Sequence, residues 1–389
     1  MKKSLIAVAV AGLFAAPAAM AEVTLSGAIN LGIEIAKSSA SGPASSLTRT
    51  LLNSNYSHID LESVDDIGGG NKVIFHYQMQ VNPQTTGLNG GPFNRDSFLG
   101  IAGSWGAFKM GTNENVYERM MYTADPMDGA LGPGGNLMIL GTPGANTAFD
   151  AGQSACGPTN GTGCIGFYRR TDQTIWYESP NFSGFSFEID QTLSAFKQNT
   201  PSSFDPTVTS IGGKFQPEGA PFYVDLAYER HKDMFGLVGI AASQGIAVTG
   251  ATGSKDTGVQ VGGGYMIGDL GLHLRYEQLK YQLDSTGGSD DYKRNAVWFG
   301  AKYNLPSGYV GAEIGVAADG KLDGVKQDKT GATMYGVGYF HNLSKQSQLQ
   351  FIYGATQNKD NANYTQAGAP GSAVGQDHQV FHVGIKHTY

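Results

Sequence analysis

Residues 23–35 read VTLSGAINLGIEI. Apolar residues and one glycine occupy every odd position, whereas polar or small residues occupy every even position. A period of two is typical of a β-strand, because successive side chains point to opposite faces. Strands in soluble sheets usually have only about five or six residues. The stretch therefore predicts an unusually long strand with one wholly apolar face.

The same alternation recurs along the chain, for example in KVIFHYQMQV (72–81), FYVDLAYE (222–229) and LGLHLRYE (270–277). We count sixteen such strands, joined by seven short turns and eight long loops. The long loops include 38–55, 113–170, 231–256 and 284–292. An even number of alternating strands, with short turns at one end and long loops at the other, predicts an all-β transmembrane antiparallel barrel. A soluble β-sandwich or β-solenoid is the alternative.

The N-terminus predicts a secretory signal peptide over residues 1–21. Lys2 and Lys3 precede an apolar run, and Ala19-Met20-Ala21 is a small-residue cleavage site. The remainder, 22–389, is predicted to form one barrel domain in the outer membrane. None of its segments approaches the eighteen consecutive apolar residues that indicate a membrane-spanning helix.

The composition argues against several classes of function. The 389 residues carry a formal net charge of −7, which does not favour binding to nucleic acid. No G-x-S-x-G, H-E-x-x-H or Walker-type motif is present, so neither an enzyme nor a bound cofactor is predicted. His382 and His387 fall on opposite faces of their strand, and no metal site is predicted.

Cys156 and Cys164 are the two cysteines of the chain. An exported protein enters an oxidising compartment, so we expect a disulfide between them. It would close a loop with seven intervening residues and stabilise the fold by roughly 2–3 kcal/mol at most.

Several segments carry a family resemblance. FNRDSFLGIAGSWGAFKMGT (93–112), IWYESPNFSGFSFEI (175–189), YFHNLSKQSQLQFIYGAT (339–356) and the terminal VGIKHTY (383–389) resemble Gram-negative general porins of the β-proteobacterial type. The resemblance implies a sixteen-stranded homotrimeric barrel in the outer membrane, in contact with lipid and lipopolysaccharide. It also implies that the third long loop folds into the lumen as a constriction.

Two segments depart from the family pattern. SHIDLES (57–63) stands where the family commonly has SRxGFxG, so that His58, Asp60 and Glu62 would face the lumen. Thr112 stands where the family commonly has the arginine of LGR, whereas Arg95 is retained. These departures argue against strong anion selectivity.

The 113–170 segment is the candidate constriction, because so long a link within a compact structure is either functional or disordered. Its acidic residues would face basic residues of the barrel wall across the pore and set up a transverse electric field. The candidate loop residues are Glu114, Glu118, Arg119, Asp125, Asp128, Arg169 and Arg170, and the candidate wall bases are Arg95 and Arg294.

The predicted function is passive diffusion of ions and small hydrophilic solutes. Strand residues expected to face the lumen include ten acids and eight bases, which predicts a weak cation preference. A substrate-specific channel, or a barrel whose loops bind a ligand or act as an adhesin, is the alternative. The unusually apolar loop 231–256 could contact a neighbouring subunit or a ligand, or could fold back as extra strands.

Overall fold

The computed structural model describes residues 22–85, 87–88, 95–127, 132–144, 164–197, 204–248, 251–371 and 373–389. The predicted signal peptide, residues 1–21, lies outside this part of the chain and remains a prediction. The strands are β1 (Glu22–Ser38), β2 (Leu47–Ser54), β3 (His58–Gly68), β4 (Asn71–Asn82), β5 (Gly87–Leu88), β6 (Ser97–Gly103), β7 (Gly106–Glu114), β8 (Arg170–Glu178), β9 (Phe185–Thr192), β10 (Thr207–Phe215), β11 (Phe222–Lys232), β12 (Gly253–Ile267), β13 (Leu270–Ser285), β14 (Gly288–Leu305), β15 (Gly308–Ala317), β16 (Lys321–Leu322), β17 (Val325–Lys326), β18 (Ala332–Asn342), β19 (Ser347–Asn358) and β20 (His378–Thr388).

Three short helical elements accompany these strands in the described residues. They are α2 (Val116–Tyr122), the 3-10 turn η1 (Asn136–Met138) and α3 (Gly236–Gln244). None of the three is long and apolar enough to cross a bilayer.

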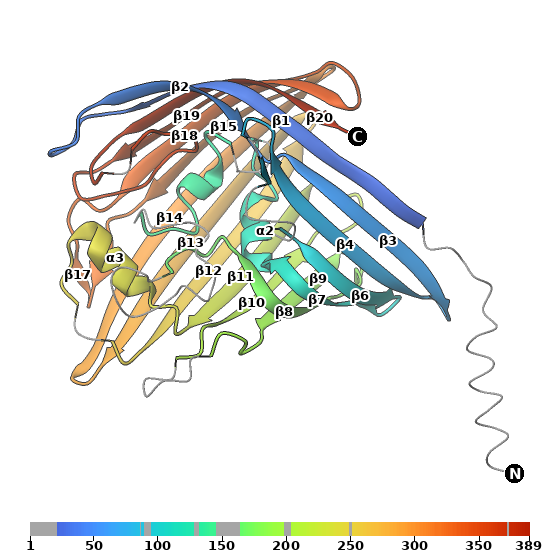
Figure 1. Ribbon diagram of the computed structural model, residues 1–389, viewed down its shortest axis with the longest axis horizontal. Coiled ribbons are helices and arrows are strands. Elements are labelled where there is room, and N and C mark those ends of the chain that lie inside the picture. Colours follow the sequence, from blue (N-terminus) through green and yellow to red (C-terminus); the bar gives the residue numbers. More distant parts are fainter. Residues whose placement is uncertain are drawn as a thin grey trace, which may run out of the picture.

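The strands pair antiparallel with their neighbours around a closed ring. The first strand closes the ring by pairing with the last, in the register Ala28↔Thr388 to Ser38↔His378. Closure leaves no unpaired edge, so the backbone N–H and C=O groups of the wall are satisfied within the sheet. Figure 1 shows the ring of strands with α2 inside it.

The ring has sixteen strands in the described residues, as predicted. The twenty named strands include three of only two residues, β5, β16 and β17. In addition, β2 and β3 both pair with β1 and together form one wall strand interrupted at residues 55–57.

Two predicted loops are shorter than expected. Residues 47–54 of the predicted loop 38–55 form β2, and only 286–287 separate β13 from β14 in the predicted loop 284–292. Polar side chains replace apolar ones where these strands run beyond the apolar band of the wall. The hydrophobic alternation therefore disappears although the backbone pairing continues.

The outer face of the wall is apolar, as the opening stretch predicts. Val23, Leu25, Ile33 and Ile35 point outward and are between 51% and 67% exposed, whereas Glu34 between them is fully buried. In water such a surface would be costly, because the apolar area would stay hydrated. Hydrocarbon covers it without any protein partner.

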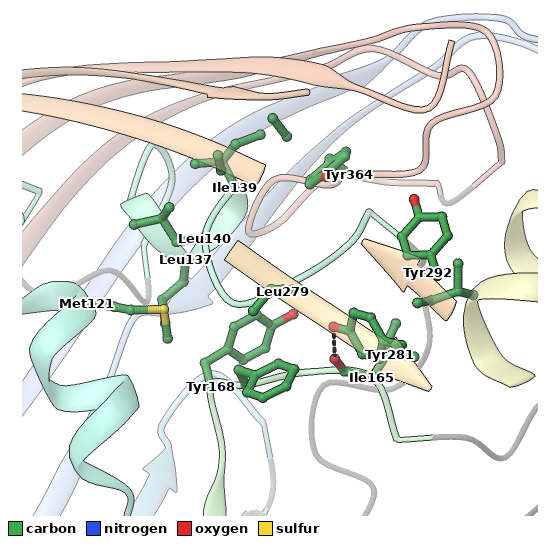
Figure 2. Packing of buried hydrophobic residues seen from close by; sticks show 14 of the residues in the cluster. Met121, Leu137, Ile139, Leu140, Ile165, Tyr168, Leu279, Tyr281, Tyr292 and Tyr364 are labelled. Carbon is green, nitrogen blue, oxygen red and sulfur yellow. Dashed lines mark hydrogen bonds between the residues drawn. The ribbon is translucent and has the colours of Figure 1, made fainter. Parts of the chain in front are cut away.

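The main buried cluster lies inside the barrel. Aromatic and aliphatic residues of 117–168 pack there against Leu279, Tyr281 and Trp298 of the wall. Figure 2 shows this packing, with the hydroxyl of Tyr281 donating to the backbone oxygen of Ile165 at 2.6 Å. The interior is therefore partly filled by inward-folded chain.

Phe299→Arg tests the assignment of the two faces. Phe299 points outward from the middle of β14, where an arginine at the bilayer midplane costs about 2–4 kcal/mol. We expect Phe299→Arg to lower the free energy of unfolding in lipid vesicles by this amount, measured by urea titration. Gln348→Arg, on the lumen side of β19, is the control and should change it little. Equal losses for both variants would contradict the assignment.

Candidate functional site

The inner loop, residues 115–169, runs along the inside of the wall. It is described over 115–127, 132–144 and 164–169, and its helix α2 packs against β9, β10 and β11. The predicted fold of the 113–170 segment into the lumen is thus observed for the described residues.

Wall side chains cap the N-terminus of α2. The first N–H groups of a helix have no partner within the helix, and a carboxylate there also interacts favourably with the helix dipole. The Val116 amide donates to Asp190 Oδ2 at 2.8 Å, and the Tyr117 amide donates to Ser210 Oγ at 3.2 Å. The side chain of Asn115, which precedes the helix, donates instead to Glu229 Oε2 at 3.1 Å.

Glu277 is a second anchor for the inner loop. Its two carboxylate oxygens accept hydrogen bonds from the Gly141 amide at 3.0 and 2.8 Å, and Oε2 accepts one from the Tyr117 hydroxyl at 3.1 Å. Arg294 donates to Glu277 Oε1 at 2.6 Å and to the backbone oxygen of Ile139 at 2.8 Å. Both Arg294 and Glu277 are buried, so this pair holds the loop to the wall and does not line an opening.

Glycines of the wall allow the inner loop to approach closely. A Cβ atom on Gly336 would lie 2.7 Å from the Gly134 backbone oxygen, and one on Gly354 would lie 2.3 Å from the Gly134 nitrogen. Gly134 itself has φ +80, which side-chain-bearing residues rarely adopt. Only glycine at these positions lets two backbones meet.

The apolar loop 231–256 also folds inward. It forms α3, which packs against β13. Phe235, Leu237 and Ile240 are fully buried there. Asp256 Oδ2 accepts a hydrogen bond from the Gly236 amide at 3.1 Å, which repeats the capping of α2 by Asp190. In its described residues the loop adds no extra strands, so that expectation is wrong. The apolar side chains are covered by the wall.

The charged zone, the residues around Arg95, Asp96, Glu114, Arg119 and Arg170, lies where β6, β7 and β8 meet the start of the inner loop. Arg170 pairs with Asp96 at 3.0 Å and with Glu114. Arg119 pairs with Glu188, and its side chain also donates to Asn113 Oδ1 at 3.0 Å. Asp96, Arg119 and Arg170 keep between 17% and 29% of their side chains exposed.

Glu118 is a further acidic neighbour of this zone. It belongs to α2 and is buried. Burial, and next the adjacent Glu114 carboxylate, raise the pKa of Glu118 well above its ordinary value. Burial thus disfavours the charged form of Glu118.

Tyr56 holds Arg95 in place. Tyr56 lies at the interruption between β2 and β3 and has a left-handed backbone with φ 64. Its ring faces the Arg95 guanidinium at 4.2 Å. Arg95 also donates to Gln78 Oε1 at 2.8 Å and to Gln80 Oε1 at 3.0 Å.

His58 and Asp60 lie close to the charged zone on the lumen side of β3. Asp60 contacts His58 Nε2 at 3.2 Å and His76 Nε2 at 3.1 Å, and it is buried. Glu62 lies further along the strand, half-exposed, with one oxygen 3.8 Å from His76 Nδ1. Within the described ranges, no three such side chains converge as metal ligands would.

The remaining predicted residues divide into three groups. Asp125 accepts the Met127 and Asn136 amides at 2.6 and 2.7 Å and so shapes the inner loop. Arg169 is buried and donates to the Gly166 oxygen at 3.0 Å. Asp128 and Cys156 lie outside the described residues, so the disulfide of Cys164 remains a prediction.

The prediction that Arg294 contributes to a transverse electric field across the pore is wrong. We expected Arg294 to face acidic residues of the loop across open water. Instead it meets a loop carbonyl and the wall carboxylate of Glu277 in a dry contact. Arg95, by contrast, lies near loop and wall charges in the charged zone.

The sequence reasoning missed two features of this site. The aromatic support of Arg95 by Tyr56 has no local signal, because Tyr56 lies at a strand break next to the segment 38–55, which the pattern assigned to a loop. The glycine contacts have a signal that was not used. Gly336, Gly338 and Gly354 all occupy lumen-facing positions, where a wall facing only water has no need of glycine.

Comparisons with known proteins fit this geometry. The family described as Gram-negative porin matches residues 7–361. The chain belongs to the Gram-negative porin family. It is 27% identical to outer membrane porin protein 32 of Delftia acidovorans over 395 residues, which cover all of both chains.

Solved structures share the fold of this porin. The anion-selective porin from Comamonas acidovorans superposes with a TM-score of 0.71 at 21% identity, over 95% of this chain and all of the other. A trimer form of OmpT, an outer-membrane protein of Vibrio cholerae, gives a TM-score of 0.59 at 12% identity, over 95% and 99% of the two chains. The porin is thus a diffusion channel of the Gram-negative outer membrane and not an enzyme.

Glu277→Gln tests the anchoring of the inner loop. The substitution leaves the buried Arg294 without a carboxylate, which should lower the free energy of unfolding by about 3–5 kcal/mol. The weakened anchor should also make the single-channel current noisier in planar bilayers. Glu178→Gln is the matched control, because the Glu178–Lys109 pair is partly exposed and should be worth about 1 kcal/mol or less. Similar effects in both variants would contradict this role of Glu277.

Proposed function

We propose that this porin conducts ions and small hydrophilic solutes with a weak preference for anions. The observation that carries the proposal is the use of the wall carboxylates. Glu277, Asp190 and Glu229 are buried and bind the inner loop, and Glu34 binds Asn53, Asn55 and His382. These contacts keep the four carboxylates away from the water of the lumen, and the charge of Glu277 is offset by the buried Arg294 beside it.

The weak cation preference predicted from the sequence is not supported. Its tally counted every lumen-facing acid as if it met water. Asp225 is one further example, since it is buried in a bidentate pair with Arg275, with distances of 2.7 and 3.0 Å. The similar porin from Comamonas acidovorans is described as anion-selective, which agrees with the opposite sign.

Lysines on the lumen side support an anion preference. They lie near the short-turn end of four different wall strands, and each keeps part of its surface exposed: Lys72, Lys214, Lys302 and Lys386. A fifth, Lys109, is paired with Glu178. Lys214 and Lys302 lie over the rings of Tyr223 and Tyr309 at 4.8 and 3.9 Å. A ring contact orients a lysine without cancelling its charge.

The pore-lining roles follow from exposure. The residues that would contact passing solutes are Asp96, Arg119 and Arg170. Two further residues, Arg95 and His58, would lie behind these side chains and influence solutes through their charge. Glu114, Glu118, Asp60 and Arg294 would act mainly by holding the wall and the inner loop together. We propose further that residues 1–21 are removed on export and that 22–389 is the mature barrel.

We also propose a homotrimer. The outer face has an apolar groove over β4, β6, β7 and β8, of about 670 Å³, lined in part by Phe75, Leu99 and Met110. The outward-facing Asp172, which accepts from Thr112 Oγ1 at 3.1 Å, also lines it. A carboxylate on the outer face is unfavourable against lipid, so contact with another subunit suits this face better. One similar structure is a trimer form.

A substrate-specific channel or an adhesin is the second candidate. The apolar loop that favoured it, 231–256, packs inward in its described part, and this removes its main support. Saturation or block of the current by a solute would favour the specific channel.

Ion selectivity can be measured directly. We expect the reversal potential in a KCl gradient across planar bilayers to have the sign of chloride preference. Lys214→Gln with Lys302→Gln should reduce it, because two lumen cations are lost. Lys37→Gln, an outward-facing lysine of β1, is the control and should leave it unchanged. A potassium preference in the unmodified porin would overturn the proposed sign.

The oligomeric state has its own readout. A trimer of independent channels should close in three equal current steps under high voltage. Leu99→Lys, in the outer groove, should convert three-step closures to single steps by placing a cation at the subunit contact. Single-step closure of the unmodified porin would rule out the trimer.

A further inference from the structure

Two histidines flank one carboxylate on the lumen side of β3 and β4. Asp60 Oδ2 lies 3.2 Å from His58 Nε2, and Asp60 Oδ1 lies 3.1 Å from His76 Nε2. Asp60 is the register partner of Gln78, and Glu62 is that of His76, so these side chains form one group on two adjacent strands. The side chains of His58 and His76, the histidine pair, keep 14% and 20% of their surface exposed. The pair is therefore accessible to water and ions in the lumen.

Each ring of the histidine pair presents both of its nitrogens to acceptors. His58 Nδ1 lies 3.2 Å from the backbone oxygen of Tyr56, and His58 Nε2 meets Asp60. His76 Nε2 meets Asp60, and His76 Nδ1 lies 3.8 Å from Glu62 Oε1. Carbonyl oxygens and carboxylates only accept hydrogen bonds, whereas a neutral imidazole has a single N–H to donate. The positively charged ring, with a proton on each nitrogen, is the form that can donate in both directions.

Tyr56 and Gln78 connect the histidine pair to Arg95 of the charged zone. The centroid of the Tyr56 ring lies 4.4 Å from that of His58 and 4.2 Å from the Arg95 guanidinium. The Gln78 side chain donates to Asp60 Oδ1 at 2.7 Å and accepts from Arg95 at 2.8 Å. A change of charge at the pair therefore occurs directly beside the charged zone.

Further titratable and charged groups face the histidine pair from other elements. Besides the residues already named, they are Asp96, next to Arg95, Lys109, which lies over the Phe98 ring that contacts His76, and Tyr389 at the C-terminus. All of these groups are carboxylates, basic side chains or phenols. Histidine is the side-chain type that ordinarily changes its charge between about pH 5 and pH 8. The pair is thus the part of this group that responds to mild acidification.

We propose that His58 and His76 are specificity-determining residues whose charge makes the ion preference of the channel depend on pH. With both rings neutral, the carboxylates of Asp60 and Glu62 leave this part of the wall negative. With both rings protonated, the two imidazolium charges cancel the two carboxylates. Acidification therefore removes an attraction for cations and a repulsion of anions, and the preference shifts toward anions. This conclusion rests on ion conduction through the lumen and holds whichever ion the porin prefers at neutral pH.

The reversal potential in a KCl gradient, measured in planar bilayers at about pH 7.5 and about pH 5.5, tests this role. In the unmodified porin the chloride-to-potassium permeability ratio should rise about threefold on acidification, as expected for two charges a few ångströms from an ion in water. His58→Gln with His76→Gln should keep the ratio of the higher pH and lose most of the rise, because the amide stays uncharged. A rise of full size in this variant, or none in the unmodified porin, would overturn the proposal. A potassium preference at the higher pH contradicts only the proposed function, because this test measures a change and not a sign.

Two further double variants separate the histidine pair from other titratable groups. His341→Gln with His387→Gln removes two histidines that point outward from β18 and β20, and this control should keep the full rise. His58→Arg with His76→Arg fixes both positive charges and should show, at both pH values, the ratio that the unmodified porin reaches on acidification. Loss of the rise in the outward variant, or a full rise in the arginine variant, would count against the pair. Circular dichroism spectra equal to that of the unmodified porin show that each variant forms the barrel.

Discussion

Hydrogen bonds from backbone amides of inward-folded segments to carboxylates of the barrel wall hold the interior of this porin together. A chain segment placed inside a barrel brings N–H groups that need partners once water is removed. Asp190, Glu277 and Asp256 provide them at the starts of α2 and α3 and at Gly141. Without these acceptors the inner loop would either leave the wall or bury unpaired amides.

The same contacts determine how the lumen treats ions. A carboxylate covered by the inner loop does not touch passing ions, and the charge of Glu277 is offset by Arg294 in the same contact. A ring contact, such as that of Lys214 with Tyr223, does not offset the charge of a lysine. The electrostatic character of the channel therefore depends less on how many charges the wall carries than on which of them the inner loop covers. Arg294 and Arg170 illustrate the difference, since one is covered completely and the other is partly exposed.

The outer face obeys a different constraint, set by the membrane. Its apolar rows meet hydrocarbon, for example the register partners Leu226, Val261, Tyr276 and Val297 on adjacent strands. The barrel thus has two environments, an enclosed polar one and a peripheral apolar one. They are separated by the single thickness of the sheet, which allows conduction and lipid contact to vary independently.

The sequence by itself determined the all-β class, the sixteen strands and the face that residues occupy in the segments that alternate. It could do so because a period of two is a local property of the backbone and because lipid demands an unbroken apolar face. The family resemblance further implied that the long 113–170 segment folds inward. The tertiary structure decided the rest. Whether Glu277 or Arg294 meets water depends on contacts between residues more than a hundred positions apart. Tyr56 reaches Arg95 only because the wall strand is interrupted after β2, a segment that the sequence analysis assigned to a loop. Side-chain parity fixes the direction of a residue, but only packing fixes what lies in front of it.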